Sequence, residues 1–166
     1  RRVLFRSLKI ENDEINQYGR RNTLRITGVA EEEEENVKQT LLKIANDKLK
    51  VVLLPSEIDR CHRMKSLNQD PSKPQVIIAK FISYDARDRL YSARKNLKST
   101  GIFISEHLTP ARAKILKYAR SLKIEGKFEN AFSKDGRILI KTNDKEYKLV
   151  HSISDVNALL QGSKNS

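Results

Sequence analysis

Arginines gather in one short segment near the start of the sequence, Arg20-Arg21-Asn22-Thr23-Leu24-Arg25-Ile26. Guanidinium groups form paired hydrogen bonds to phosphates and also stack on nucleobases. The segment places two cations at a junction, and it places Arg25 on the exposed side of a strand predicted over residues 23–29. The chemistry that these residues favour is contact with the phosphates of a polyanion.

Two later segments add cations suited to the same chemistry. A second strand is predicted over residues 57–65 and a third over residues 75–83. If the first strand lies beside the third, Arg25 and Lys80 share a cationic stripe with one arginine of the second strand. The cations of these two strands are Arg60, His62, Arg63, Lys65 and Lys80. Pairing with neighbouring carboxylates is the alternative, and the sequence does not say which pairs form among Glu57, Asp59 and Asp85.

A predicted helix that begins at Pro110, with Thr109 as its N-cap, carries a third set of cations. On a wheel of about 100° per residue these cations fall within about 140°, opposite an apolar stripe, and Leu116 is the one apolar residue among them. We therefore expect a basic face on this helix. The cations are Arg112, Lys117, Arg120, Lys123 and Lys127, and the apolar stripe is Ala111, Ile115, Tyr118, Ala119 and Leu122.

The histidines, the cysteine and the carboxylates do not combine into a catalytic or metal-binding set. Cys61 and His62 are adjacent on a predicted strand, so their side chains point to opposite faces and do not form a nucleophile and base or paired ligands. His107 and His151 lack ligand partners at metal-binding spacing, and the sequence has no glycine-rich phosphate loop. The order of elements also occurs in small acyl-phosphate hydrolases, but the five glutamates at 31–35 would repel a phosphate substrate. We expect no enzyme activity, no metal and no cofactor.

The composition is that of a small basic protein. Its 166 residues allow one domain or two small ones, and 33 Lys and Arg against 21 Asp and Glu give a formal charge of +12 and a pI near 9.9. The excess is spread through the predicted elements, which indicates basic surfaces on folded structure and polyanionic partners. The single cysteine, Cys61, is expected in or near the core and fits a reducing compartment. No apolar run approaches the roughly 18 residues of a membrane span, so no membrane contact is expected.

The beginning of the sequence indicates a piece of a longer protein. The first residue is Arg1 and the only methionine is Met64. Over residues 1–19, apolar side chains recur at heptad-like spacing, with Glu11 at the seam position between them. An amphipathic helix, a frayed terminus and the end of a coiled coil all fit this pattern. The apolar residues are Leu4, Leu8, Ile15 and Tyr18.

Residues 20–108 predict an α+β fold with the order strand, helix, strand, strand, helix, strand. This order is typical of a ferredoxin-like domain, in which two helices cover one face of an antiparallel sheet. The other face stays open, and RNA-recognition modules use it. The third strand has only Phe81 where the usual motif has several stacking aromatics, so we expect backbone contacts with low sequence specificity. The predicted elements are the strand 23–29, the helix 36–49, the strands 57–65 and 75–83 about a turn at 66–74, the helix 84–98 and the strand 102–105.

Residues 109–161 predict a second, small α+β domain. After the basic helix, Asp135-Gly136 is a strong hairpin signal, and the chain turns again near Asn143-Asp144. Ser152 and Asp155 resemble a capping box that opens a last helix, which stops at Gly162, and residues 162–166 are expected to be a disordered tail. The core candidates of the strands are Ile138, Ile140, Tyr147 and Leu149.

Four blocks in this order resemble the RNA-binding protein encoded by the first open reading frame of LINE-type (non-LTR) retrotransposons, with the baculovirus few-polyhedra protein as a more distant relative. The likeness covers about residues 12–150. It lies in the ordered series, since each block alone is unspecific. The blocks are RRNTLRITGV at 20–29, CHR at 61–63, KFISYDAR at 80–87 and IFISEHLT at 102–109.

The resemblance implies a noncanonical RNA-recognition domain and a small C-terminal domain that bind single-stranded RNA or DNA as a chaperone, without catalysis. It also implies a homotrimer built by a coiled coil that lies mostly before this sequence, and a cytoplasmic ribonucleoprotein particle with access to the nucleus. The residues it assigns to nucleic acid are Arg20, Arg21, Arg25 and Arg63, with Arg112 to Lys127 facing the cleft. The alternative of another class is an assembly module that binds an acidic protein partner.

Overall fold

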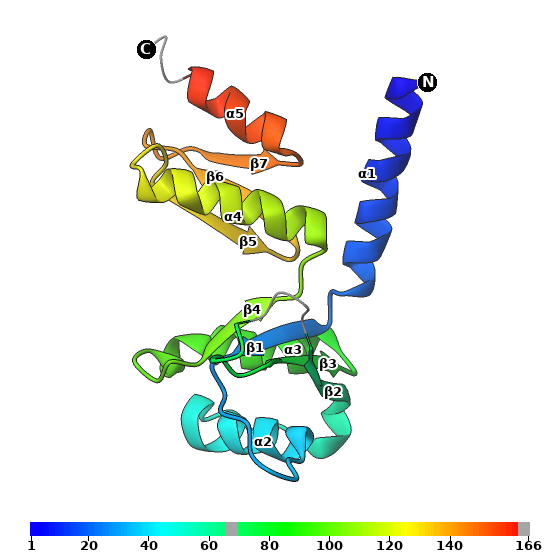
Figure 1. Ribbon diagram of the computed structural model, residues 1–166, viewed down its shortest axis with the longest axis vertical. Coiled ribbons are helices and arrows are strands. Elements are labelled where there is room, and N and C mark those ends of the chain that lie inside the picture. Colours follow the sequence, from blue (N-terminus) through cyan, green and yellow to red (C-terminus); the bar gives the residue numbers. More distant parts are fainter. Residues whose placement is uncertain (66–69, 163–166) are drawn as a thin grey trace. The chain divides into compact units, whose positions relative to one another are not determined.

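The computed structural model describes residues 1–65 and 70–162, and it confirms a mixed α+β fold (Figure 1). The chain divides into two compact units. The central unit is Arg21–His107, and the terminal unit combines Arg1–Arg20 with Leu108–Ser166. Parts of the predicted turn at 66–74 and of the predicted tail at 162–166 lie outside the described residues.

The central unit has the predicted order of strands and helices. Its four strands form one antiparallel sheet in the order β2-β3-β1-β4. Gly28 ends the first strand at φ +83°, and a Cβ there would lie 2.0 Å from the carbonyl oxygen of Gly101, so only glycine fits. The elements are β1 (Thr23–Thr27), α2 (Val37–Ile44), β2 (Ile58–Met64), β3 (Val76–Phe81), α3 (Tyr84–Ser92) and β4 (Phe103–Glu106).

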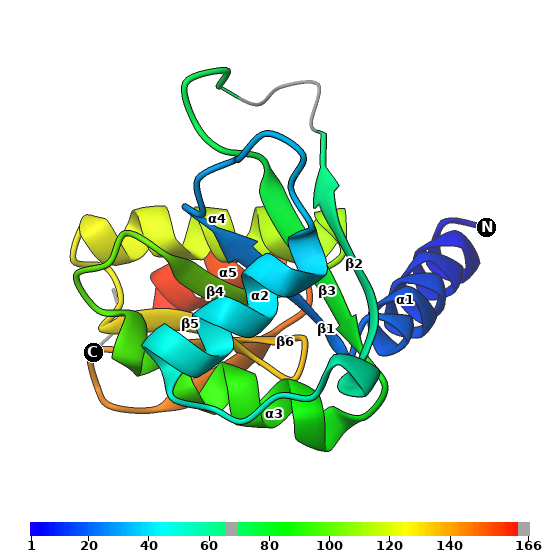
Figure 2. The same ribbon diagram turned by 90° about the horizontal axis from the view of Figure 1, so that it is seen from below.

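Both helices of the central unit pack on the same side of the sheet (Figure 2). The strands contribute every second side chain to this core, because successive side chains of a strand point to opposite faces. Burial of these apolar side chains is the main stabilising interaction of the unit. The strand residues of the core include Leu24, Ile26, Ile77, Ala79, Phe81 and Ile104, and the helix residues include Leu41, Ile44, Ala86 and Leu90.

The two helices are shorter than the sequence predicts. α2 begins after Asn36, whose side chain accepts a hydrogen bond from the Gln39 amide, and it passes into a π-helical turn at Ala45–Leu49. α3 begins after the N-cap Ser83 and passes into a 3-10 helix at Ala93–Leu97. The apolar repeat continues through the wider π-helical turn and the tighter 3-10 turn, which is why periodicity alone predicts one longer helix in each place.

The terminal unit contains the first helix of the chain as well as its last five elements. Its three strands form an antiparallel sheet in the order β5-β6-β7, and β5 and β6 are joined by the predicted Asp135-Gly136 turn, with both residues at positive φ. Ser152 accepts a hydrogen bond from the Asp155 amide at the start of the last helix. The elements are α1 (Arg2–Gly19), α4 (Pro110–Ile124), β5 (Asn130–Lys134), β6 (Arg137–Lys141), β7 (Tyr147–Val150) and α5 (Ile153–Gly162).

A buried arginine ties α1 to the rest of the terminal unit. The Arg112 guanidinium lies 2.7 Å from Asp13 and 2.8 Å from Glu14 of α1, and it donates a hydrogen bond of 2.9 Å to the carbonyl of Gly136. The Thr109 hydroxyl donates a second bond to Asp13, at 2.6 Å. One side chain therefore connects α1, α4 and the β5–β6 turn.

Two sequence predictions about this unit are wrong. The helical wheel placed Arg112 and Leu116 on an exposed basic face, but both residues are buried, because α1 and α5 widen the covered side of α4. Tyr147 and Leu149 were expected in the core, but they are 61% and 45% exposed. Val150 pairs with the buried Ile138 and therefore points into the core, so Leu149 points out of it. Side chains alternate along a strand, so an error of one residue in the assumed register exchanges the buried and exposed faces.

Gly136→Ala is expected to destabilise the terminal unit by about 2 kcal/mol more than Gly126→Ala. Both glycines have a φ of +77°, so an alanine is strained at either position. An added Cβ at Gly136 would lie 2.6 Å from Cγ of the buried Gln17, whereas Gly126 has no neighbour within 4 Å. Urea unfolding followed by circular dichroism measures both variants, and equal losses would contradict the close packing of α1 on this turn.

Candidate nucleic-acid interface

The sheet of the central unit has a second face that the core does not use. Strand pairing aligns its residues in rows across the sheet. Within the described residues, none of these side chains belongs to the hydrophobic core of the unit. We call this surface the cationic face. Its first row is Arg60, Lys80 and Thr23, and its second row is His62, Ile78, Arg25 and Ser105. The next pairs are Met64 with Val76, from β2 and β3, and Thr27 with Phe103, from β1 and β4.

Three cations from three strands share this face. Arg60 and Lys80 are directly opposite each other and exposed, and Arg25 lies one row away. The only carboxylate paired with Lys80 in the described chain is Asp59, at 3.8 Å, and both side chains are half exposed, so the pair is weak. Arg25 is half-buried, and its Nε is buried without a hydrogen-bond partner among the described residues. The side chains of Arg60 and Lys80 are therefore accessible to phosphates, and the half-buried Arg25 lies beside them.

Phe103 adds an aromatic ring that the sequence analysis missed. It lies on β4 opposite Thr27, on the cationic face, and it is 68% exposed. The signal was present in the sequence, because Phe103 alternates with the buried residues Ile102 and Ile104. An exposed ring beside arginines on a sheet is the type of surface on which unpaired bases stack.

Arg63 is turned to the other side of the sheet. Its guanidinium forms two bonds to the Glu35 carboxylate, at 2.6 and 3.0 Å, and donates to the carbonyls of Val29, Ala30 and Gln75. Both side chains are 9% exposed. The hydrogen bonds from Arg63 hold the pKa of Glu35 below its ordinary value. Arg63 therefore holds the loop after β1 against β2, and its donors are already in use.

The other cations predicted around the sheet lie at its margins. Arg20 follows α1 and donates to the carbonyl of Leu108 at 3.3 Å, within the terminal unit. Arg21 begins the central unit and is exposed, and Lys65 is exposed just after β2. None of the three has a position in the rows of the cationic face.

Two arginines of α3, Arg87 and Arg89, pair with carboxylates around the sheet. Glu57 and Asp85 both bind Arg89 of α3, at 3.1 Å for Asp85. The hydrogen bond from the Leu54 amide, followed by that from Arg89, lowers the pKa of Glu57. Arg87 forms a buried pair with Glu106 at 2.6 Å, which ties α3 to β4. Of the three candidate partners Glu57, Asp59 and Asp85, only Asp59 pairs with a predicted site residue in the described structure.

The predicted cations of α4 are also divided between exposed side chains and a buried, paired one. Lys117, Arg120 and Lys123 are exposed, whereas Arg112 is held by α1. The Nε of Arg120 lies 3.5 Å from the carbonyl of Ala131, at the limit of a hydrogen bond. The terminal unit therefore has a basic side on α4, but Arg112 is not part of it.

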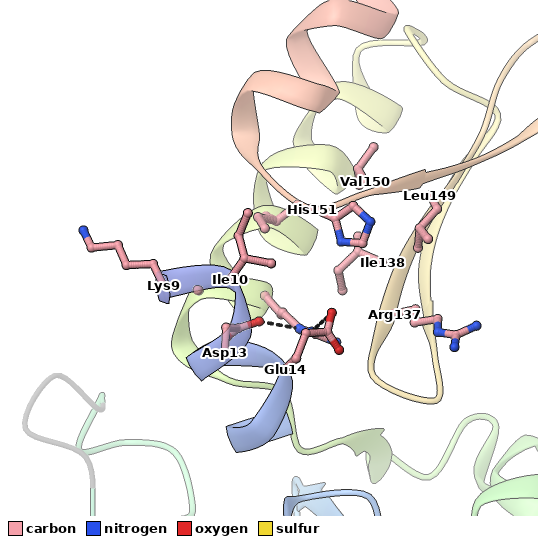
Figure 3. Close-up of a pocket in the computed structure, with 12 residues that line it drawn as sticks. Lys9, Ile10, Asp13, Glu14, Arg137, Ile138, Leu149, Val150 and His151 are labelled. Carbon is pink, nitrogen blue, oxygen red and sulfur yellow. Dashed lines mark hydrogen bonds and ion pairs between the residues drawn. The ribbon is translucent and has the colours of Figure 1, made fainter. Parts of the chain in front are cut away.

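A cavity of about 180 Å³ lies between α1 and the sheet of the terminal unit (Figure 3). Ile10 of α1, Ile138 of β6 and Val150 of β7 form part of an apolar wall, and His151 lies beside it. The carboxylates that line it, Asp13 and Glu14, are paired with Arg112. These two carboxylates thus serve the joint between α1 and α4.

The structure offers no support for a reactive cysteine or a metal site in the part of the chain that it describes. Burial raises the pKa of the Cys61 thiol to about 11, so the thiol is protonated at neutral pH and is a weak nucleophile. Residues 1–65 and 70–162 contain no group of three His, Cys, Asp or Glu side chains that could hold a metal ion. No helix in these ranges combines the length and apolar character needed to span a membrane.

No protein-family model matches this sequence, and no curated protein matches it either.

Glu35→Gln is expected to lower the stability of the central unit by about 2 kcal/mol at neutral pH, because it removes the charged acceptor of Arg63. Since the pKa of Glu35 is lowered in the folded state, its contribution is complete above the ordinary value of 4.5 and is lost as pH falls through the lowered value. The difference between wild type and variant should therefore shrink in acid. Urea unfolding at several pH values tests this, with the exposed Glu33→Gln as the charge control. A difference independent of pH would contradict the role of the Glu35 charge.

Proposed function

We propose that the protein binds single-stranded RNA, and also single-stranded DNA, without catalysing a reaction. The observation that carries this proposal is the strand register that brings Arg25, Arg60 and Lys80 onto one face of the central sheet. Phosphate neutralisation by such cations supplies most of the affinity for a nucleic acid and carries little sequence information. The formal charge of +12 supports the same partner class.

Unpaired strands suit this face better than a duplex. The exposed ring of Phe103 lies at one side of the face, and unpaired bases can stack on it while their phosphates meet the cations. The resemblance to retrotransposon RNA-binding proteins supports the same reading. On this proposal the domain is of the RNA-recognition type, and the protein covers a transcript in a ribonucleoprotein particle and lets strands rearrange.

Self-assembly through α1 is a second candidate function, and one observation favours it. Leu4, Leu8 and Ile15 are 66%, 54% and 70% exposed, although they share one side of the helix. Their heptad-like spacing fits a second copy of the same helix. Assembly would also raise affinity for nucleic acid, because linked sites gain effective concentration.

Replacing Arg25, Arg60 and Lys80 together by alanine is expected to weaken binding to a single-stranded oligonucleotide at least about tenfold at low salt. It should also reduce the slope of log affinity against log salt by about 2, since each phosphate contact on a single strand contributes about 0.7. Fluorescence anisotropy measures both quantities for RNA and DNA. The matched control replaces Lys43, Lys48 and Lys95, which are exposed and lie away from the face.

Equal losses in the two triple variants would show that only total charge matters and would overturn the assignment to this face. Competition distinguishes an acidic protein partner from nucleic acid. Unlabelled oligonucleotide should displace the labelled strand at far lower concentration than polyglutamate of the same charge. Absence of binding by the folded wild type at low salt would remove the proposed function.

Leu8→Glu is expected to abolish self-association through α1, because it places a charge in the centre of the apolar stripe. Light scattering after size exclusion should give wild-type masses that rise with concentration to a multiple of 19.1 kDa and a variant mass of one chain. Asn16→Glu adds the same charge at an exposed position of α1 outside the stripe and should behave like wild type. A wild type that stays at one chain at all concentrations would exclude this second candidate.

A further inference from the structure

The sheet of the terminal unit also has two unlike faces. Ala131, Ile138, Ile140 and Val150 point to the helices and form the core of this unit. The opposite face aligns Phe132 with Leu139 and Leu149 in one row, and Lys141 with Tyr147 in the next. We call this second surface the aromatic face.

Large apolar side chains are left accessible on this face. Tyr147 is 61% exposed and Leu149 is 45% exposed, while Phe132 and Leu139 are half-buried beside them. Phe132 and Tyr147 meet edge to face with ring centroids 6.2 Å apart, which holds the two rings in defined orientations. A contiguous group of this kind on a small protein marks a contact surface more often than single exposed apolar residues do.

Exposed cations on the same face favour a polyanionic ligand. Lys134 and Arg137 are exposed and opposite each other at the end of the face nearest the β5–β6 turn. Leu149 and Arg137 project from neighbouring strands (Figure 3). The ammonium of Lys141 lies 5.7 Å from the Tyr147 ring, and its charge is balanced by Glu129 at 2.8 Å. The two exposed cations lie one row from Phe132 and two rows from Tyr147, so a strand stacked on the Tyr147 ring can reach them with phosphates further along its backbone.

We propose that the aromatic face is a second nucleic-acid-binding surface, on which an unpaired base stacks on Tyr147 while Lys134 and Arg137 contact phosphates further along the same strand. This inference takes its ligand class from the proposed function, but it uses a different unit and a different sheet. It is also separate from the basic side of α4, because α4 packs against the opposite face of the same sheet. Stacking on a side chain tolerates any base, so this surface adds affinity for single strands without strong sequence preference.

The absence of tryptophan from the sequence makes this surface easy to monitor. Tyr147→Trp introduces a single indole on the aromatic face, and Ile124→Trp introduces one at a position that is 86% exposed at the end of α4. Each full-length variant is titrated with an oligo(U) RNA and an oligo(dT) DNA while emission is recorded. Stacking of a base should quench and shift the emission of the first variant, and the control should change little.

Two side-chain replacements give the energetic test. Tyr147→Leu keeps an apolar residue suited to the strand but removes the ring, and it should lower affinity at least about fivefold, since one base-aromatic stack contributes about 1–3 kcal/mol. Tyr147→Phe keeps the ring and should retain wild-type affinity. Circular dichroism checks that both variants are folded.

Each outcome supports or overturns the inference. Unchanged emission of Tyr147→Trp, or equal affinities of the Leu and Phe variants, while anisotropy still reports binding, would overturn the second surface and leave the proposed function intact. Lack of binding by wild type would overturn both. An emission shift that follows protein concentration without oligonucleotide would show that a second copy covers the face, and this too would overturn the inference.

Discussion

Alternation along the strands is the constraint on which both candidate surfaces depend. A strand presents successive side chains to opposite faces, and in each unit the helices cover only one face of the sheet. β3 places Ile77, Ala79 and Phe81 in the core and therefore must place Ile78 and Lys80 on the other side. The same rule turns Val150 inward and Tyr147 outward in the terminal unit. The residues that build the cores thus determine which residues are presented together outside them.

Charge in this protein has two separate uses. Arg63, Arg87 and Arg112 are nearly buried, and each binds a carboxylate from a different segment of the chain. A buried arginine without its partner would be strongly unfavourable, so these pairs hold specific segments together rather than contribute surface charge. The pairs leave the formal charge of +12 unchanged, because each arginine is balanced by a carboxylate. They do reduce the number of cations that can contact a phosphate, because the three arginines are already bound. Arg60 and Lys80 stay on that list because their strand carries them away from the core.

Local pattern was sufficient to predict the elements and the order of the central unit, because helix and strand periods are properties of neighbouring residues. The N-caps Ser152 and Thr109 and the Asp135-Gly136 turn are local in the same sense. The errors arise where a distant segment decides the outcome. A helical wheel of α4 has no means of including α1, which buries Arg112 from almost a hundred positions away. Register between β6 and β7 likewise depends on a pairing that neither strand specifies alone.

The tie between Asp13 and Arg112 makes the terminal unit discontinuous in sequence, with the whole central unit inserted between its two parts. During synthesis, α1 emerges before α4, and its partner Arg112 follows about a hundred residues later, which at 5–20 residues per second is a delay of roughly 5 to 20 seconds. All four strands of the central unit are synthesised before α4, so this unit can fold before the terminal unit is complete. Throughout this interval α1 carries an uncovered apolar stripe and two carboxylates without their arginine partner, so the nascent chain passes through a stage in which this helix is open to chaperones or to neighbouring chains on the same message.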